Sequence, residues 1–299
     1  MVVHQHPSSL ARAMWAAAEP FTLYGLASPE MFEAMTGLGI HKRGVFLAAR
    51  GAVLGEAGSA TVAAAFHAFP RSQFEEFLSP IWAFTSPAEV IATHHATIPV
   101  MALRVLPRET NQADLHSLAN QLGIVIGNLD VSGRPLASGN QAIELPAEPW
   151  AKFWRAWSTL REYRGDAHIA VLISHNLTVA EVQVLSTTWG EANYDVKMLR
   201  KTRNMTDEIW SAAQVRLAAR GLLRVDGSLT PEGQELRENI EIQTDEACMN
   251  AWNQFSVTEL NHLYNFTYAL SEAVVSSGAF PAHTAVGSPW PPPSSPTLE

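Results

Sequence analysis

The feature that most constrains the fold is a series of helix signals and tight turns in the second half of the chain. Residues 198–205 predict a short helix, and Thr206 can cap a second helix that ends in the RGLL run at 220–223. Two short apolar segments then flank the Asp-Gly pair at 226–227, which favours a type I′ turn between paired strands. The LTPEG run at 229–233 starts a further helix, with threonine as its cap and proline in its first turn. The sequence therefore predicts helix, turn, helix, tight β-hairpin and helix, in that order.

This order of elements is that of a winged helix. The RGLL and LTPEG runs, at this spacing, resemble the MarR family of winged-helix proteins. Over residues 11–281 the chain also resembles an actinobacterial branch of MarR-like proteins, through GRPL at 133–136, REYRGDAH at 161–168 and SSG at 276–278. The resemblance implies a mainly α fold with a C-terminal MarR-like winged-helix domain and a short β-hairpin wing. It implies no particular activity.

Composition and chain punctuation indicate a globular protein with two domains. Hydrophobic residues make up 47% of the chain and charged residues 16%, which is enough apolar material for a sizeable core. Helical segments separated by Pro and Gly predict a helical N-terminal domain over 10–125, followed by a turn-rich linker over 126–149. A stripe of aromatic residues from Trp150 begins the winged-helix domain with its C-terminal helices, over 150–277. The proline-rich tail at 278–299 is predicted to be disordered.

Several classes of site lack their sequence signals. The single cysteine, Cys248, excludes an intrachain disulfide and any multi-cysteine zinc site. Neither a signal peptide nor an apolar run of membrane-spanning length is apparent, so the cytoplasm is the expected location and no membrane partner is expected. The metalloprotease, Walker A, dinucleotide-binding and nucleophile-elbow motifs do not occur. No metal site is predicted, and the identity of any cofactor is left open.

The charge pattern disfavours specific DNA binding. The net charge of −9 at pH 7 repels phosphate backbones at long range. In helix-turn-helix proteins the N-terminal end of the second helix faces the bases, and here that end carries Asp207 and Glu208. The alternative explanation is that these acids only stabilise the helix dipole. Between 206 and 233 three basic residues stand against four acidic ones, giving −1: Arg216, Arg220 and Arg224 against Asp207, Glu208, Asp226 and Glu232.

One basic cluster favours the opposite conclusion. Four positive charges lie on the predicted helix that in such motifs crosses the phosphate backbone: Lys197, Arg200, Lys201 and Arg203. They are candidates for non-specific phosphate contact. The alternative is a solvated helix face with no partner. DNA is therefore kept as a second, less favoured partner.

The candidate ligand-binding residues lie in two places along the chain. Arg164 and His168 are four residues apart and share a helix face, with Asp166 between them in sequence. An arginine can hold an anion with two hydrogen bonds, and a histidine can donate, accept or transfer a proton. Arg50 and His67 are polar residues in very apolar predicted helices, from which they could reach a pocket between the two halves. For all of these residues, the alternative is an internal network of ion pairs and hydrogen bonds.

Three functions follow from these observations. The preferred interpretation is a small-ligand-binding or sensor protein on a winged-helix scaffold, which holds an anionic or aromatic molecule and has lost specific DNA binding. The second is a MarR-like transcriptional regulator that binds DNA. The third is an enzyme of actinobacterial secondary metabolism that uses Arg164, Asp166 and His168, although no motif assigns a catalytic role. A homodimer is left open.

Overall fold

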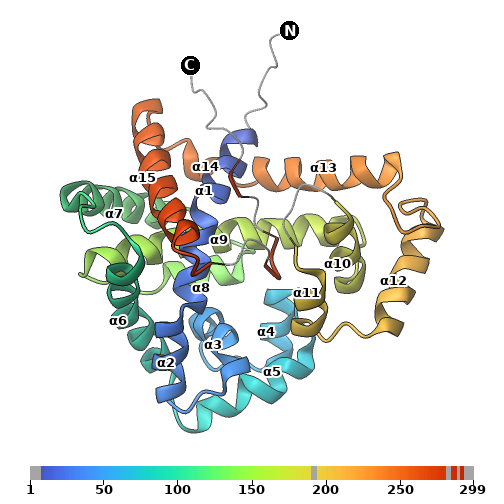
Figure 1. The fold of residues 1–299 in the computed structure, drawn as a ribbon, viewed down its shortest axis with the longest axis horizontal. Coiled ribbons are helices and arrows are strands. Elements are labelled where there is room, and N and C mark those ends of the chain that lie inside the picture. Colours follow the sequence, from blue (N-terminus) through green and yellow to red (C-terminus); the bar gives the residue numbers. More distant parts are fainter. Residues whose placement is uncertain (1–7, 190–193, 281–283, 288–289, 293–299) are drawn as a thin grey trace.

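The computed structural model describes the chain except for residues 1–7, 190–193, 281–283, 288–289 and 293–299. The described part is built from helices joined by turns (Figure 1). In the N-terminal half the helices are α1 (Ser8–Ala27), α2 (Pro29–Gly37), η1 (Lys42–Gly44), α3 (Val45–Gly51), η2 (Ala52–Leu54), α4 (Ser59–Phe66), α5 (Arg71–Phe77), η3 (Ser79–Ala83), α6 (Pro87–Val105) and α7 (Gln112–Gly127). The C-terminal half contains α8 (Pro135–Gln141), α9 (Pro149–Ser174), α10 (Val179–Thr188), α11 (Val196–Thr202), α12 (Asp207–Ala219), α13 (Pro231–Glu246), α14 (Met249–Trp252) and α15 (Val257–Ser276).

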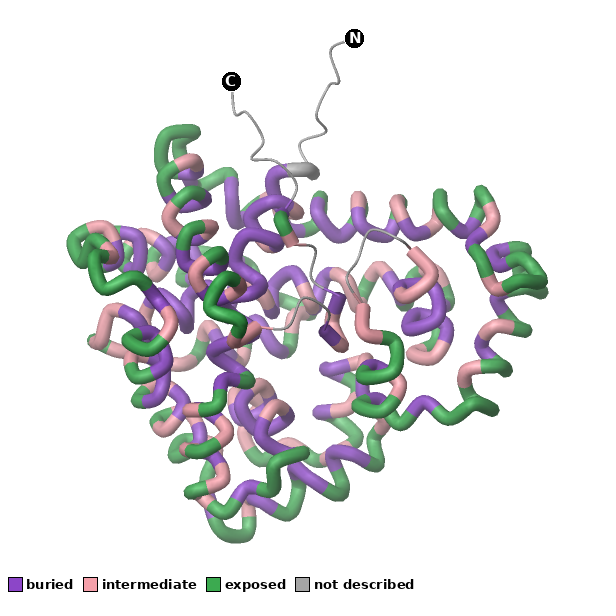
Figure 2. Tube along the Cα trace, viewed as in Figure 1, coloured by how far each residue is buried: buried purple, intermediate pink, exposed green. Residues whose placement is uncertain are grey.

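Helix α9 is the centre of the molecule. It packs against α1, α6, α7, α8 and α13, and Figure 1 shows it running through the middle of the fold. Its aromatic stripe is buried: Phe153, Trp154 and Trp157 are at most 2% exposed. The Trp154 indole nitrogen donates to the Thr22 carbonyl oxygen of α1 at 3.2 Å, so the ring packs without leaving its polar atom unpaired. Figure 2 shows the same pattern, with burial concentrated on the central helices.

The predicted helix starts around the turn between α11 and α12 are confirmed. The Thr206 side chain accepts a hydrogen bond from the Ile209 amide at the start of α12. The Thr230 side chain caps α13 in the same way, accepting from the Gly233 amide at 3.0 Å. Capping threonines satisfy amides that a helix end leaves without partners. The predicted helix–turn–helix order is therefore present in the structure.

The predicted β-hairpin wing, and with it the winged-helix fold class, is wrong. Between α12 and α13 a single antiparallel bridge joins Leu223 to Leu229, and the described residues contain no strand or sheet. The ladder cannot grow toward its tip, because the Asp226 carboxylate accepts from the Ser228 amide at 2.9 Å and closes a tight turn. It cannot grow the other way, because Thr230 already caps α13. The part of the chain described here is an all-helical fold that contains a helix-turn-helix.

The buried apolar residues form two clusters. The larger one includes the N-terminal helices, the first part of α9 up to Ala167, and residues of α14 and α15. The smaller one begins at Leu172 near the end of α9 and continues through α10, α12 and α13. Helix α8 lies within the expected linker and packs on α9. The division into domains at 126–149 stays a prediction.

The described part of the C-terminal tail contacts the body of the protein. The Asp195 amide donates to the Thr284 carbonyl oxygen at 3.0 Å, and the Trp290 ring stacks on Tyr268. Much of the segment predicted to be disordered, including 293–299, lies outside the described residues.

Two further findings concern metal-binding groups and membrane-spanning helices. Within the described ranges, no group of His, Cys, Asp and Glu side chains is arranged to hold a metal ion. No single described helix has the length and apolarity needed to cross a membrane; only the bent pair α9–α10 meets that test, when taken together.

Candidate functional site

A central cavity lies where the two apolar clusters meet. It has a volume of about 560 Å³, within the range of about 300–1,000 Å³ that is usual for small-molecule sites. Its walls come from α1, α3 and α4 on one side, from α10, α13 and the residue after α11 on the other, and from α9 between them. Tyr194 and the C-terminal residues 285–287 and 291 complete the lining. Four of the five predicted ligand-binding residues line it: Arg50, His67, Arg164 and His168.

Helix α9 supplies one wall because its polar residues recur every three or four positions. Arg161, Arg164 and His168 therefore lie on one face of the helix. Gly165 belongs to the same face, and a Cβ built there would meet only the Glu162 carboxylate at 3.6 Å. Glycine inside a helix costs about 1 kcal/mol relative to alanine. Gly165 therefore makes α9 less stable and leaves the cavity wall without a side chain at this position.

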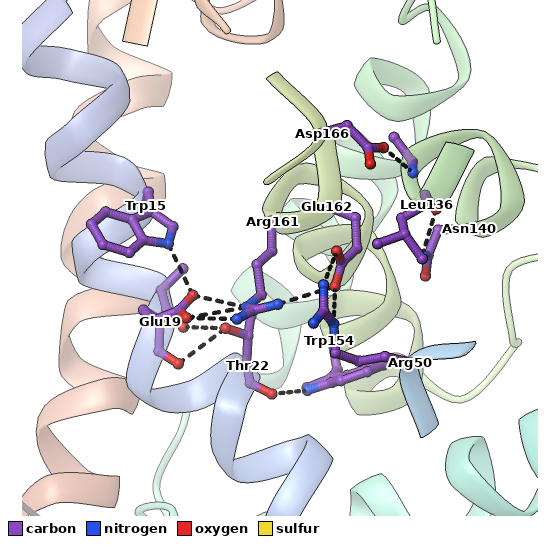
Figure 3. Close-up of polar contacts among 12 residues, drawn as sticks. Trp15, Glu19, Thr22, Arg50, Leu136, Asn140, Trp154, Arg161, Glu162 and Asp166 are labelled. Carbon is purple, nitrogen blue, oxygen red and sulfur yellow. Dashed lines mark hydrogen bonds and ion pairs between the residues drawn. The ribbon is translucent and has the colours of Figure 1, made fainter. Parts of the chain in front are cut away.

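A buried network of ion pairs lines one part of the cavity (Figure 3). The Arg50 guanidinium binds the Glu162 carboxylate through two hydrogen bonds of 2.7 and 2.8 Å. Arg161 lies between two acids, 3.0 Å from Glu162 and 2.9 Å from Glu19. Burial alone would raise the pKa of Glu162, but Arg50 and Arg161 outweigh it and hold that pKa below its usual value. The network ties α1, α3 and α9 together.

A second network joins α9 to α13 and α1. Arg164 contacts Glu241 at 2.7 Å and Asp245 at 2.9 Å, while Arg12 contacts Asp245 at 2.8 Å. Arg237 binds the other oxygen of Glu241 at 2.9 Å. The positive charge of Arg164, the strongest candidate for binding an anion in the sequence, is therefore already matched by two carboxylates.

The two histidines of the cavity are neutral, and His168 is held by a hydrogen bond. His168 Nδ1 lies 3.0 Å from the Thr244 hydroxyl, which itself donates to the Ile240 carbonyl oxygen. The hydroxyl must therefore accept from Nδ1, which leaves His168 Nε2 without a proton. Burial lowers the pKa of His168 to about 4, and it also lowers the pKa of His67. His67 Nε2 is buried without a hydrogen-bond partner among the described residues.

Asp166 lies outside the cavity. One carboxylate oxygen accepts from the Ala137 amide at 2.8 Å, at the start of α8 (Figure 3). Burial raises the pKa of Asp166 to about 7, against the effect of the Ala137 hydrogen bond. The structure therefore separates Asp166 from His168, and the two do not form the acid–base arrangement that their spacing in the sequence suggested.

The sequence did not indicate that Arg203 turns inward. Arg203 caps the C-terminus of α11, in the turn that leads to α12, and its side chain lines the cavity. It is only 6% exposed, and its guanidinium lies over the Phe69 ring at 3.6 Å. No carboxylate pairs with it in the described part of the chain, and its Nε has no hydrogen-bond partner there. Burial, together with repulsion from Arg50, lowers the pKa of Arg203 to about 9.

The cavity carries excess positive charge in a protein that is negative overall. Six arginines line it against three glutamates, and two further acids, Glu238 and Asp245, pair with these arginines from outside the lining, so the surplus is one; the whole chain has a net charge of −9. At the end near Arg203 the balance is three arginines to two acids: Arg50, Arg161 and Arg203 against Glu19 and Glu162. This end lacks one negative charge.

The other three residues of the predicted phosphate-contacting cluster stay near the surface. Lys197 and Lys201 are exposed, and Arg200 pairs with Asp207 at the start of α12. All three line a shallow groove formed by α11 and the turn that leads to α12, the α11–α12 groove. Asp207 is 89% exposed in its side chain, so the acidic start of α12 faces solvent.

Comparison with known proteins identifies one family. A helix-turn-helix family matches residues 11–281, which is most of the chain. No curated protein and no solved structure matches it. The family match agrees with the α11–turn–α12 arrangement and gives no ligand or reaction.

Proposed function

Because the chain belongs to the helix-turn-helix family, we propose that it is a regulator-type scaffold whose central cavity binds a small anionic molecule. The observation that carries this proposal is Arg203: a buried guanidinium that faces the cavity and has no carboxylate partner among the described residues. The other cavity arginines have such partners. The ligand supplies the missing negative charge.

Energetics support an anion at this position. A buried charge without a partner costs several kcal/mol, and that cost falls when a hydrogen-bonded anion is placed beside it. A guanidinium can hold a carboxylate with two parallel, charge-assisted hydrogen bonds. The open edges of the Arg203 guanidinium are suited to this arrangement, since one of its faces is already occupied by Phe69.

The rest of the cavity favours a singly charged ligand with an apolar body. Phe66, Leu172 and Trp189 provide apolar walls. His67 and His168 are neutral, so they offer hydrogen bonds without a second positive charge. A monocarboxylate with a flat hydrocarbon body matches both properties.

The proposal is tested by calorimetry with two probes of the same shape. We expect 2-naphthoate to bind wild-type protein at least about tenfold more tightly than the neutral 2-naphthamide, because only the acid gains a charge-assisted hydrogen bond of about 1.5–3 kcal/mol. Arg203→Gln should lose this preference. The matched control is Arg200→Gln, which removes a guanidinium from the same helix outside the cavity and should retain it. Equal binding of the acid and the amide to wild-type protein would contradict the proposal.

A second candidate function, contact with DNA phosphates, is favoured by the α11–α12 groove. Lys197, Arg200 and Lys201 line it, and the helix-turn-helix family match is compatible with contact to DNA. We expect salt-sensitive retention of duplex DNA in a mobility-shift assay, because phosphate contacts release counterions. The double variant Lys197→Ala, Lys201→Ala should weaken it. Retention that is unaffected by salt and by both substitutions would exclude this surface.

A further inference from the structure

The turn between α11 and α12 forms part of the cavity wall. Arg203 lies in this turn, where its amide still bonds to the Leu199 carbonyl oxygen at 2.9 Å while its side chain points into the cavity. Asn204 follows with φ of 50°, a left-handed conformation that reverses the chain direction. The outer surface of the turn belongs to the α11–α12 groove. One turn therefore separates the cavity from the groove.

Few contacts hold this turn to the N-terminal half. The Gln73 side chain of α5 donates to the Thr202 carbonyl oxygen at 2.8 Å, and the Arg43 guanidinium lies 3.5 Å from the Asn204 side-chain oxygen. The third contact is the stacking of Arg203 on Phe69. Helix α12 adds little, since only Ala213 and Leu217 of its residues are buried. Of these three contacts, only the stacking on Phe69 depends on whether the Arg203 side chain stays inside the cavity.

Arg203 is held inside by packing and opposed by its own charge. Stacking on Phe69 favours the inward position, whereas desolvation of a cation without an acid partner opposes it. Repulsion adds to the opposition, since Arg50 and Arg161 are the neighbouring cations. An anion in the cavity leaves the stacking on Phe69 unchanged. It lowers the cost of the buried charge, because it gives the guanidinium a partner.

We infer that an anion bound beside Arg203 fixes the turn between α11 and α12 against the segment around Phe69, so that occupancy of the cavity controls the position of α12. This inference rests on the proposed function for its ligand. In the empty protein the Arg203 side chain can leave for solvent, and the turn opens with it. In the occupied protein the closed turn is favoured. A ligand shifts such an equilibrium only through its differential affinity for the two states, and here Arg203 is the source of that difference.

Hydrogen–deuterium exchange on the full chain tests the inference, with the amides of residues 196–210 as the readout. Adding 2-naphthoate to wild-type protein should slow exchange in this segment about tenfold or more, the factor that corresponds to one charge-assisted hydrogen bond. Exchange in α7, which lies away from the cavity, should not change. Binding of 2-naphthoate measured by calorimetry without slower exchange at 196–210 would overturn the inference and leave the proposed function intact.

A second hydrogen–deuterium exchange experiment needs no ligand. Arg203→Met keeps an unbranched apolar side chain against Phe69 and removes the buried charge, so exchange at 196–210 should be slower than in wild type even in the empty protein. Arg200→Met, on the outer side of the same helix, is the control and should not slow it. Slower exchange in Arg203→Met supports the inference even if 2-naphthoate fails to bind, a result that would count against the proposed ligand. Faster exchange in Arg203→Met would mean that the charge itself holds the turn, and would overturn the inference.

Discussion

The first half of α9 and the helix α12 are held in the fold in opposite ways. In α9 the residues from Trp150 to Leu160 are buried almost without interruption, among the helices of the larger apolar cluster. In α12 only Ala213 and Leu217 are buried, and both belong to the smaller cluster. Figure 2 shows this contrast between the centre of the molecule and its α12 edge. Under the proposed function, ligand binding should therefore move α12 more easily than α9.

The same contrast appears in the electrostatics. Arg161 and Arg164 of α9 each contact two carboxylates. Arg155, also buried on α9, bonds to the neutral side chains of His95 and Asn140. The buried cation next to α12, Arg203, has none among the described residues. Paired charges join elements into one rigid body, whereas an unpaired buried charge stores a cost that a ligand can relieve. Arg203 therefore lies beside a helix, α12, that has few buried residues.

The largest expected effect follows from emptying the core around α9. Trp154→Ala removes a fully buried ring and its hydrogen bond to Thr22. We expect a loss of about 3–5 kcal/mol in the free energy of unfolding, the usual cost of deleting a buried aromatic side chain. Urea denaturation followed by far-UV circular dichroism measures it. A loss below that of the α12 variant described next would contradict the comparison.

In the smaller cluster, Leu217→Ala should cost less and act locally. Leu217 is fully buried on α12, and a loss of about 2–3 kcal/mol lies at the low end for leucine-to-alanine changes. We expect faster hydrogen–deuterium exchange across α10 to α12, with α7 and the first half of α9 unaffected. Faster exchange throughout the molecule would show that the two clusters unfold as one.

These two regions also show what the sequence can and cannot determine. The caps Thr206 and Thr230 and the aromatic stripe of α9 were predictable, because they depend on neighbours within one or two helical turns. The wing was not, because the turn closed by Asp226 and the cap formed by Thr230 leave a single bridge between Leu223 and Leu229. The orientation of Arg203 depends on Phe69, far away in the sequence. The partners of Arg50 and Arg164 come from other helices in the same way.

Acid should destabilise the wall of the cavity through His168. Its pKa in the folded protein is about 4, below the ordinary value of 6.5. As the pH falls below 6.5, His168 becomes protonated in the unfolded chain but stays neutral in the folded protein. The contribution of neutral His168 to the free energy of unfolding is therefore complete above pH 6.5 and is lost as the pH falls toward 4. For this partly buried group we expect a loss of about 2 kcal/mol. His168→Gln should flatten that part of the stability–pH curve; an unchanged curve would exclude His168 as its source.

The smallest effect is expected at Asp166, and it has the opposite sign. Its pKa is raised from 3.8 to about 7, so the folded protein keeps a proton that the unfolded chain loses, and the stability gained from this falls as the pH rises through 7. Asp166→Asn should therefore be about 1 kcal/mol more stable than wild type at about pH 8. The two proteins should be nearly equal at about pH 4. Thermal melting at both pH values measures it, and a variant that is less stable at the higher pH would show that the charged carboxylate is needed at the start of α8.

The most direct test of the central claim is a crystal structure of the full chain with 6-bromo-2-naphthoate, located by the anomalous scattering of its bromine. We predict one bromine peak inside the cavity, with the ligand carboxylate within hydrogen-bonding distance of the Arg203 guanidinium. A bromine peak in the α11–α12 groove, or a carboxylate bound at Arg12 or Arg237 with Arg203 still unpaired, would contradict the claim that Arg203 is the anion-binding residue.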